Sequence, residues 1–218
     1  MTKTRFIKGF AACLLIVGGC RNMRPAVVGS GVSKTETRSV ADFDEIEMNG
    51  IGRLDATIGP LSPLSVTADD NLLPLIETTV RGRTLVIRER QDVRPKSNLV
   101  FKVAIPNLKS VGVSGIASAQ VAGVKNDSLA IRINGAGDVR LVGQTDKFDF
   151  QLNGTGSLNA YELSTKSAVA EISGTGSAEL NVTAELKAKV SGIGSITYIG
   201  DPKVESHVSG LGKVSKKH

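Results

Sequence analysis

Five four-residue motifs in the second half of the chain decide its fold: Asn134-Gly135-Ala136-Gly137, Asn153-Gly154-Thr155-Gly156, Ser173-Gly174-Thr175-Gly176, Ser191-Gly192-Ile193-Gly194 and Ser209-Gly210-Leu211-Gly212. Their first glycines lie at positions 135, 154, 174, 192 and 210, so the motif recurs every 18 to 20 residues. Two related copies, Asn49-Gly50-Ile51-Gly52 and Ser114-Gly115-Ile116-Ala117, stand earlier. A repeat of this length is typical of a solenoid, in which each repeat buries its apolar face against its neighbours.

Each motif is flanked by segments in which apolar and polar side chains alternate. This period of two predicts strands with one buried and one exposed face. The residues predicted to point inward before the motifs are Leu129, Ile131 and Ile133; Phe148, Phe150 and Leu152; Ala168, Ala170 and Ile172; Leu186, Ala188 and Val190; and Val204, Ser206 and Val208. We therefore expect an all-β fold, a parallel β-helix or solenoid with rungs of about 18–20 residues.

Alignment of the repeats also pairs side chains on neighbouring rungs. Strands stacked roughly 4.8 Å apart would bring Glu171 beside Lys189. The large Phe150 would lie over the small Ala170, so that volume is shared between rungs. Both pairings favour parallel stacking.

The glycines of the motifs are predicted to form the corners between strands, because glycine adopts a positive φ at little cost. These corner glycines are Gly50, Gly52, Gly115, Gly135, Gly137, Gly154, Gly156, Gly174, Gly176, Gly192, Gly194, Gly210 and Gly212. The preceding Asn or Ser could satisfy corner backbone groups or stack as a polar ladder. A phosphate-binding loop is disfavoured, because such a loop precedes a helix whereas strands follow here. Asp138 resembles part of a calcium-binding repeat, but the other rungs carry Ser or Lys at that position.

The first 37 residues are predicted to carry a targeting signal and a linker. Basic residues at positions 3, 5 and 8 precede an uncharged stretch that is too short to span a bilayer. The stretch ends in Val17-Gly18-Gly19-Cys20, which resembles a bacterial lipobox, so residues 1–19 are predicted to be a lipoprotein signal peptide and Cys20 to be lipidated. Arg21 rather than Asp follows the cysteine, which by resemblance to known sorting signals favours the outer membrane. Residues 20–37, rich in Gly, Ser, Thr and Pro, are interpreted as the lipidated cysteine and a flexible tether.

Composition excludes several classes of function. Loss of Cys13 with the signal and lipidation of Cys20 would leave no thiol for a zinc site, and His207 and His218 are too isolated to form a histidine cluster. We therefore predict no metal and no cofactor. Half of the net charge of +6 comes from the basic residues of the targeting segment, and no basic stripe is interleaved with aromatic residues, so we predict no nucleic-acid partner. The 24 glycines, the absence of tryptophan and the 4% of aromatic residues suit a thin β stack.

Residues 38–218 are predicted to form a single solenoid domain, with divergent rungs over 38–106 and regular rungs over 107–216. Further strands are expected at residues 64–68, 84–88 and 99–106, and an exposed loop at 88–96. Asp69 and Asp70 could hold a cation, but we expect them to cap a helical turn at 72–77 or to form a turn.

Several segments together resemble the head GIN domain family, whose members are described as putative auto-transporter adhesins. They are Phe43-Asp44-Glu45-Ile46, Asp69-Asp70-Asn71-Leu72-Leu73, Thr84-Leu85-Val86-Ile87, Ile105-Pro106-Asn107-Leu108, the repeated Gly-x-Gly motifs and Tyr198-x-Gly200-Asp201-Pro202. The resemblance covers residues 29–216, and its one departure is Ala117, where the pattern has glycine. It implies a right-handed parallel β-helix that is secreted or lipid-anchored, and it implies no established activity.

Three hypotheses of function follow. The first is a non-catalytic lipoprotein of the bacterial cell envelope that binds envelope polysaccharide, peptidoglycan or an envelope protein through an outward column formed by Arg132, Gln151, Glu171, Lys189 and His207. The second is a polysaccharide-active enzyme, for which Glu171 and Glu205 are the nearest pair of carboxylates. The third is a structural surface protein that associates with itself through the ends of the solenoid, because the last rungs carry little visible cap.

Overall fold

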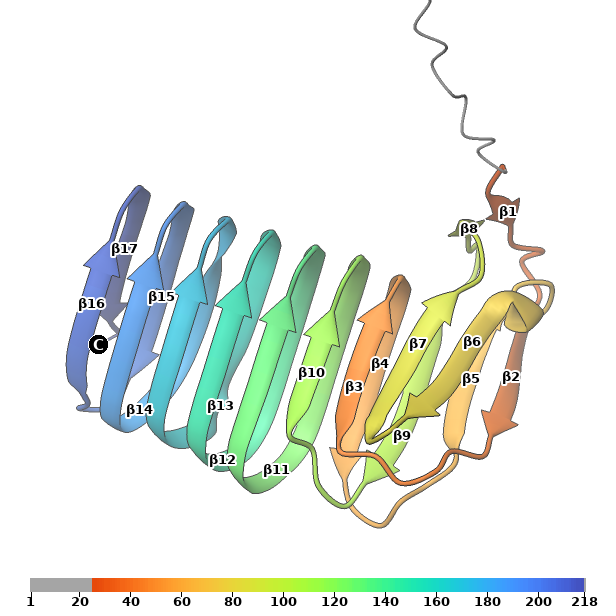
Figure 1. Ribbon diagram of the computed structural model, residues 1–218. Coiled ribbons are helices and arrows are strands. Elements are labelled where there is room, and N and C mark those ends of the chain that lie inside the picture. The colour runs from red at the N-terminus through yellow and green to blue at the C-terminus, as the bar shows by residue number, and fades with distance from the viewer. Residues whose placement is uncertain (1–24, 218) are drawn as a thin grey trace, which may run out of the picture.

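The computed structural model describes residues 25–217. Stacked parallel strands form a β-solenoid of about five turns, which confirms the predicted all-β fold (Figure 1). In each turn a strand runs to a Gly-x-Gly corner and the chain returns on the other side of a thin core.

The turns pile up into two layers. Layer A lies before the Gly-x-Gly corners and contains β3 (Glu45–Asn49), β10 (Ser110–Val113), the second halves of β11 (Ile116–Ile133), β12 (Ala136–Leu152), β13 (Thr155–Ile172) and β14 (Thr175–Val190), and β16 (Lys203–Val208). Layer B lies after the corners and contains β4 (Ile51–Ile58), the first halves of β11 to β14, β15 (Ile193–Ile199) and β17 (Leu211–Lys216). All neighbours within these stacks pair in parallel. The corners form one edge of the solenoid, and the bends within β11 to β14 form the far edge (Figure 1).

The core lies between the two layers, as the alternating pattern predicts. The predicted inward residues from Leu129 to Val190 are buried, and Phe150 is in register with Ala170. In the last rung Val204 and Val208 point inward as predicted but are not buried, being 37% and 40% exposed. They continue the inward column of β14, but no strand of the described chain stacks over them.

The N-terminal end of the solenoid is closed by antiparallel strands. β2 (Ser33–Arg38) pairs with β5 (Leu64–Asp69), and β5 pairs with β9 (Val100–Ile105). Next to them, β6 (Ile76–Arg81) pairs with β7 (Thr84–Glu89), and the 3-10 helix η1 (Leu73–Leu75) connects β5 to β6. These elements confirm the predicted strands at 64–68, 84–88 and 99–106 and the predicted helical turn.

The predicted tether is shorter than expected. β1 (Val27–Val28) pairs with β8 (Val93–Arg94), inside the predicted loop at 88–96, and β2 is a full strand of the closing sheet. The Gly, Ser and Thr content suggested a linker, but the buried carboxylate of Asp69 accepts hydrogen bonds from the backbone N–H groups of Gly31, Lys96 and Ser97. Residues 25–37 are therefore part of the folded domain.

Candidate binding face

The five residues of the predicted outward column lie in one row across layer A. The strand register places Arg132 opposite Gln151, Gln151 opposite Glu171, Glu171 opposite Lys189, and Lys189 opposite His207. Arg132, Lys189 and His207 are exposed, and the other two are half-buried. The row therefore presents two cationic groups, an amide, a carboxylate and an imidazole at intervals of about 4.8 Å. Such a surface can contact a long, repeating ligand at several points.

The row continues toward the N-terminal end through Gly112 and Glu47. Because Gly112 has no side chain, a hollow of about 540 Å³ opens between Glu47 and Arg132. Its walls also include Asn49 and Asn134. Sequence reasoning missed this hollow, although the alignment of β10 with its neighbours would place a glycine within the outward row.

The carboxylates considered for catalysis do not face each other across a cleft. Glu171 belongs to the row of Lys189 and His207, whereas Glu205 lies opposite Lys187 in the adjacent row. The two carboxylates are on strands two turns apart, and both lie on the outward face of layer A. Hydrolysis of a glycosidic bond needs two carboxyl groups on opposite sides of the bond, and this arrangement does not provide them.

The corner glycines are required for close stacking, which corrects the prediction from positive φ. Among the predicted corner glycines, only Gly52, Gly115 and Gly210 have a positive φ. A Cβ atom on Gly135, Gly154, Gly174 or Gly192 would instead overlap with the carbonyl oxygen of the corner glycine one rung earlier. The polar ladder is present, because Asn153 donates from Nδ2 to Oδ1 of Asn134 at 3.1 Å and Ser209 donates to Ser191 at 3.4 Å.

The acidic pair at 69–70 serves the fold. Burial opposes ionisation of Asp69, but hydrogen bonds from Ser97, Lys96 and Gly31 outweigh it and hold the pKa of this carboxyl below its ordinary value of 3.8. Asp70 accepts a hydrogen bond from the Ser30 hydroxyl at 2.5 Å. Neither side chain caps η1, so the N-cap alternative is wrong. The alternative of a turn is confirmed, because residues 70–72 form a turn in which the N–H of Leu72 donates to the carbonyl oxygen of Asp69 at 2.9 Å. Among residues 25–217 there is no group of three or more His, Cys, Asp or Glu side chains that could hold a metal ion.

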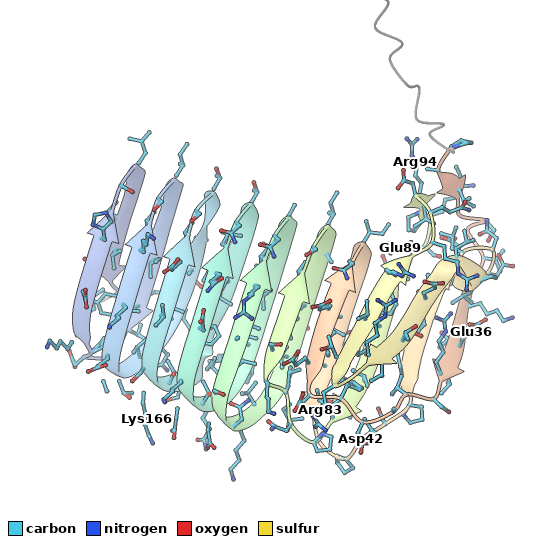
Figure 2. The ribbon with its side chains drawn as sticks, viewed as in Figure 1. Glu36, Asp42, Arg83, Glu89, Arg94 and Lys166 are labelled. Atoms are coloured by element: carbon cyan, nitrogen blue, oxygen red, sulfur yellow. The ribbon has the colours of Figure 1, made fainter. Side chains whose placement is uncertain are left out.

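A second hollow, of about 480 Å³, follows the far edge and was not predicted. Thr145 and Thr165 are buried at its floor, and Thr145 donates to Oδ1 of Asn126 at 2.7 Å. At its rim Lys166 pairs with Asp146 at 2.8 Å, and this hydrogen bond raises the pKa of Lys166. Figure 2 shows Lys166 projecting from this edge, away from the Gly-x-Gly corners. Thr145, Thr165 and Thr183 line this hollow and recur about once per turn, so their spacing is the sequence signal that could have revealed it.

The sequence profile described as "Putative auto-transporter adhesin, head GIN domain" matches residues 42–202. The chain belongs to this family. The matched region includes all four of the long strands and four of the five outward-column residues; His207 lies beyond it. No curated protein matches the chain.

Solved structures with the same fold include two putative adhesins and a putative lipid binding protein. A putative adhesin from Bacteroides fragilis is 22% identical, with a TM-score of 0.71 over 88% of this chain and 100% of that one. A putative lipid binding protein from Parabacteroides distasonis is 23% identical, with a TM-score of 0.53 over 89% and 100% of the two chains. A putative adhesin from Parabacteroides merdae is 22% identical, with a TM-score of 0.51 over 88% and 99%. At these identities the comparison establishes the fold alone.

The predicted lipidation site, Cys20, lies outside the described residues. Within residues 25–217 no helix is both long and apolar enough to cross a membrane.

Proposed function

We propose that this head GIN domain protein is a non-catalytic, adhesin-like lipoprotein of the bacterial envelope, and that the outward column of layer A binds an envelope polysaccharide or peptidoglycan. The observation that carries the proposal is the register that aligns Arg132, Gln151, Glu171, Lys189 and His207 in one straight row. A straight row with one contact per rung fits a linear polymer that lies along the solenoid axis.

The chemistry of the row fits a polar, partly anionic glycan. Arg132 and Lys189 can donate to carboxylate or hydroxyl oxygens, and Gln151 can both donate and accept. The hollow beside Gly112 gives a bulky substituent of the ligand a place next to Arg132. The adhesin description of the family supports this proposal, since adhesion requires a surface that binds another surface.

Lipidation at Cys20 would also set the orientation of the domain. Ala26 lines a hollow together with Gly50, Ile51, Gly115 and Ile116, so the chain enters the domain at the Gly-x-Gly edge. The middle residues of several corners are exposed and apolar, with Ile116 at 70% and Ile193 at 58%, whereas the far edge carries charged residues such as Lys166. An anchor in the outer membrane would therefore hold the Gly-x-Gly edge, with its exposed apolar residues, toward the lipid and leave layer A accessible from the side.

Co-sedimentation of residues 21–218 with purified peptidoglycan and with envelope polysaccharides tests the binding proposal. Released reducing ends are assayed in the same tubes. Binding without release supports a binding protein, release supports an enzyme, and the absence of both contradicts a glycan ligand.

Lipidation is tested separately in cells. The full chain should incorporate an alkynyl fatty acid and fractionate with outer membranes, and the Cys20→Ser variant should do neither. A wild-type chain that takes up no label would contradict the lipoprotein assignment without bearing on glycan binding.

A further inference from the structure

The two ends of the solenoid are built differently. The N-terminal end is covered by antiparallel strands and by η1, whereas β16 and β17 each have a strand neighbour on only one side within residues 25–217 (Figure 1). All six residues of β16 are exposed, and Val204, Val208 and Leu211 are large apolar residues among the exposed ones. An uncovered edge strand with apolar residues over an open core is a template for pairing with another strand.

We propose that two copies of this chain join through their C-terminal ends, with β16 pairing antiparallel to β16 of the second copy and β17 to β17. A two-fold axis perpendicular to the solenoid reverses the strand direction and brings the same end of both copies together. At the N-terminal end β2 and β6 also have one strand neighbour each, but all six residues of β2 are polar or charged, and Arg38 of β2 donates to the carbonyl oxygens of Leu73 and Ile76 beside β6. That end therefore offers no comparable apolar edge.

The sequence of β16 selects one register for this pairing. Along an antiparallel pair of identical strands, the residue numbers of every opposed pair add up to the same total, and this total defines the register. Because side chains alternate between the two faces, core-facing residues lie opposite core-facing residues only when the total is even. A sum of 412 places Val204 opposite Val208 on the core side and Glu205 opposite His207 on the outer side, each pair twice, with Ser206 on the axis. A sum of 410 would oppose Glu205 to itself, and a sum of 414 would oppose His207 to itself. A sum of 408 would oppose Val204 to itself and Lys203 to Glu205, but it pairs only three residues of β16, whereas a sum of 412 pairs five. The sum of 412 is therefore the longest register that joins both apolar and complementary polar pairs.

The other layer accepts the same axis. Ser206 lies four residues before Gly210 and Val214 lies four residues after it, so the two are at equivalent depths on the two sides of the corner. An axis through Val214 opposes Val214 to itself and Lys213 to Ser215. If the axis passed one residue nearer the corner, Lys213 would lie opposite Lys213 of the second copy. Both edge strands thus favour one dimer, which would join two solenoids into one continuous stack and double the outward column.

Sedimentation of residues 21–218 without ligand tests this proposal apart from glycan binding. A concentration-dependent dimer is expected. The single variants Glu205→Lys and His207→Glu should each weaken it at least several-fold, because the first removes the carboxylate acceptor opposite the His207 imidazole and the second places two carboxylates opposite each other. The double variant, which opposes a lysine to a glutamate, should restore it. A chain that stays monomeric at its solubility limit, or a double variant no tighter than the single ones, would overturn the proposal.

Cross-linking checks the axis itself. Residues 21–218 contain no cysteine, and opposed residues of antiparallel strands have Cα atoms about 4.5–5.5 Å apart, within reach of a disulfide. The variant Ser206→Cys should therefore oxidise to a covalent dimer. Ser164→Cys, an exposed position on β13, is the control, and equal rates of oxidation for both variants would contradict the predicted axis.

Discussion

The carboxylate of Glu89 accepts the backbone hydrogen bond of Ile51 that, at later corners, goes to the preceding rung. At later corners the backbone N–H of the middle residue donates to the carbonyl of a glycine one rung earlier, as Thr155 does to Gly135 at 2.9 Å. Ile51 belongs to the first corner and has no earlier glycine, so its N–H donates to Oε1 of Glu89 at 3.2 Å. Glu89 stands at the end of β7 beside the Gly-x-Gly edge (Figure 2). A side chain thereby caps the ladder of corner hydrogen bonds.

This cap has a consequence for the dependence of stability on pH. Burial raises the pKa of Glu89 above its ordinary value of 4.5. The folded protein therefore retains this proton where the unfolded chain has lost it, so this group's contribution to the free energy of unfolding falls as the pH rises from 4.5 through the folded pKa. The variant Glu89→Gln keeps an acceptor for Ile51 and carries no charge. We expect it to match or exceed the wild-type stability at pH 7, and to show a smaller advantage at pH 4.

Denaturant unfolding at both pH values measures this effect, with Glu185→Gln, at an exposed position, as the control. A loss of stability at pH 7 as large as that of Glu89→Ala would show that the charge itself is required, contrary to our account.

The inward and outward assignment is tested by neighbouring residues of β12. Phe150 is fully buried, and Gln151 points outward. Phe150→Ala should lower the free energy of unfolding by about 3–5 kcal/mol, because it leaves a cavity between rungs. Gln151→Ala should change it by less than about 0.5 kcal/mol. Similar, small shifts of both urea midpoints would mean that the two faces are misassigned.

Close stacking of the corners predicts a sharp difference between two glycines. A Cβ on Gly174 would overlap with the backbone carbonyl of Gly154, whereas a Cβ on Gly59 meets no atom within 4 Å. Gly174→Ala should therefore cost more than about 4 kcal/mol or prevent folding. Gly59→Ala should leave the thermal midpoint nearly unchanged. A tolerated Gly174→Ala, by circular dichroism and thermal melting, would contradict the stacking account.

Asp69 should control how firmly the N-terminal segment is held. Its pKa is below 3.8, so its contribution to stability is present above that pH and is lost as the pH falls through the folded pKa. Asp69→Asn should lower the thermal midpoint at pH 7 and flatten the acid side of the stability profile. The exposed neighbour Asp70, changed to Asn, should have the smaller effect. Hydrogen exchange at residues 29–35 should accelerate in the Asp69 variant, and unchanged exchange would contradict the role assigned to this residue.

The regular rungs were predictable because their two signals, the alternation of apolar residues and the recurring Gly-x-Gly, are local. The register followed from them, and with it the outward row. The clamp at Asp69 and the cap at Glu89 were not predictable, because each joins segments that are about 40 residues apart in the sequence. The role of Asp44 was not predictable for the same reason. Its carboxylate forms ion pairs with Arg83 at 2.9 Å and with Lys109 at 2.8 Å, and these pairs join the starts of β3, β7 and β10.

The central claim, that the outward column is the ligand surface, is tested most directly by one comparison of binding curves. The variant Arg132→Ala/Lys189→Ala removes two positive charges from layer A, and Arg140→Ala/Lys213→Ala removes two from layer B. In co-sedimentation with the polymer that retains the wild-type protein, we expect the first variant to bind at least ten-fold more weakly and the second to bind like the wild type, with no release of reducing ends by any of the three. Equal loss in both variants would reduce the interaction to net charge, and undiminished binding by the layer A variant would contradict the claim.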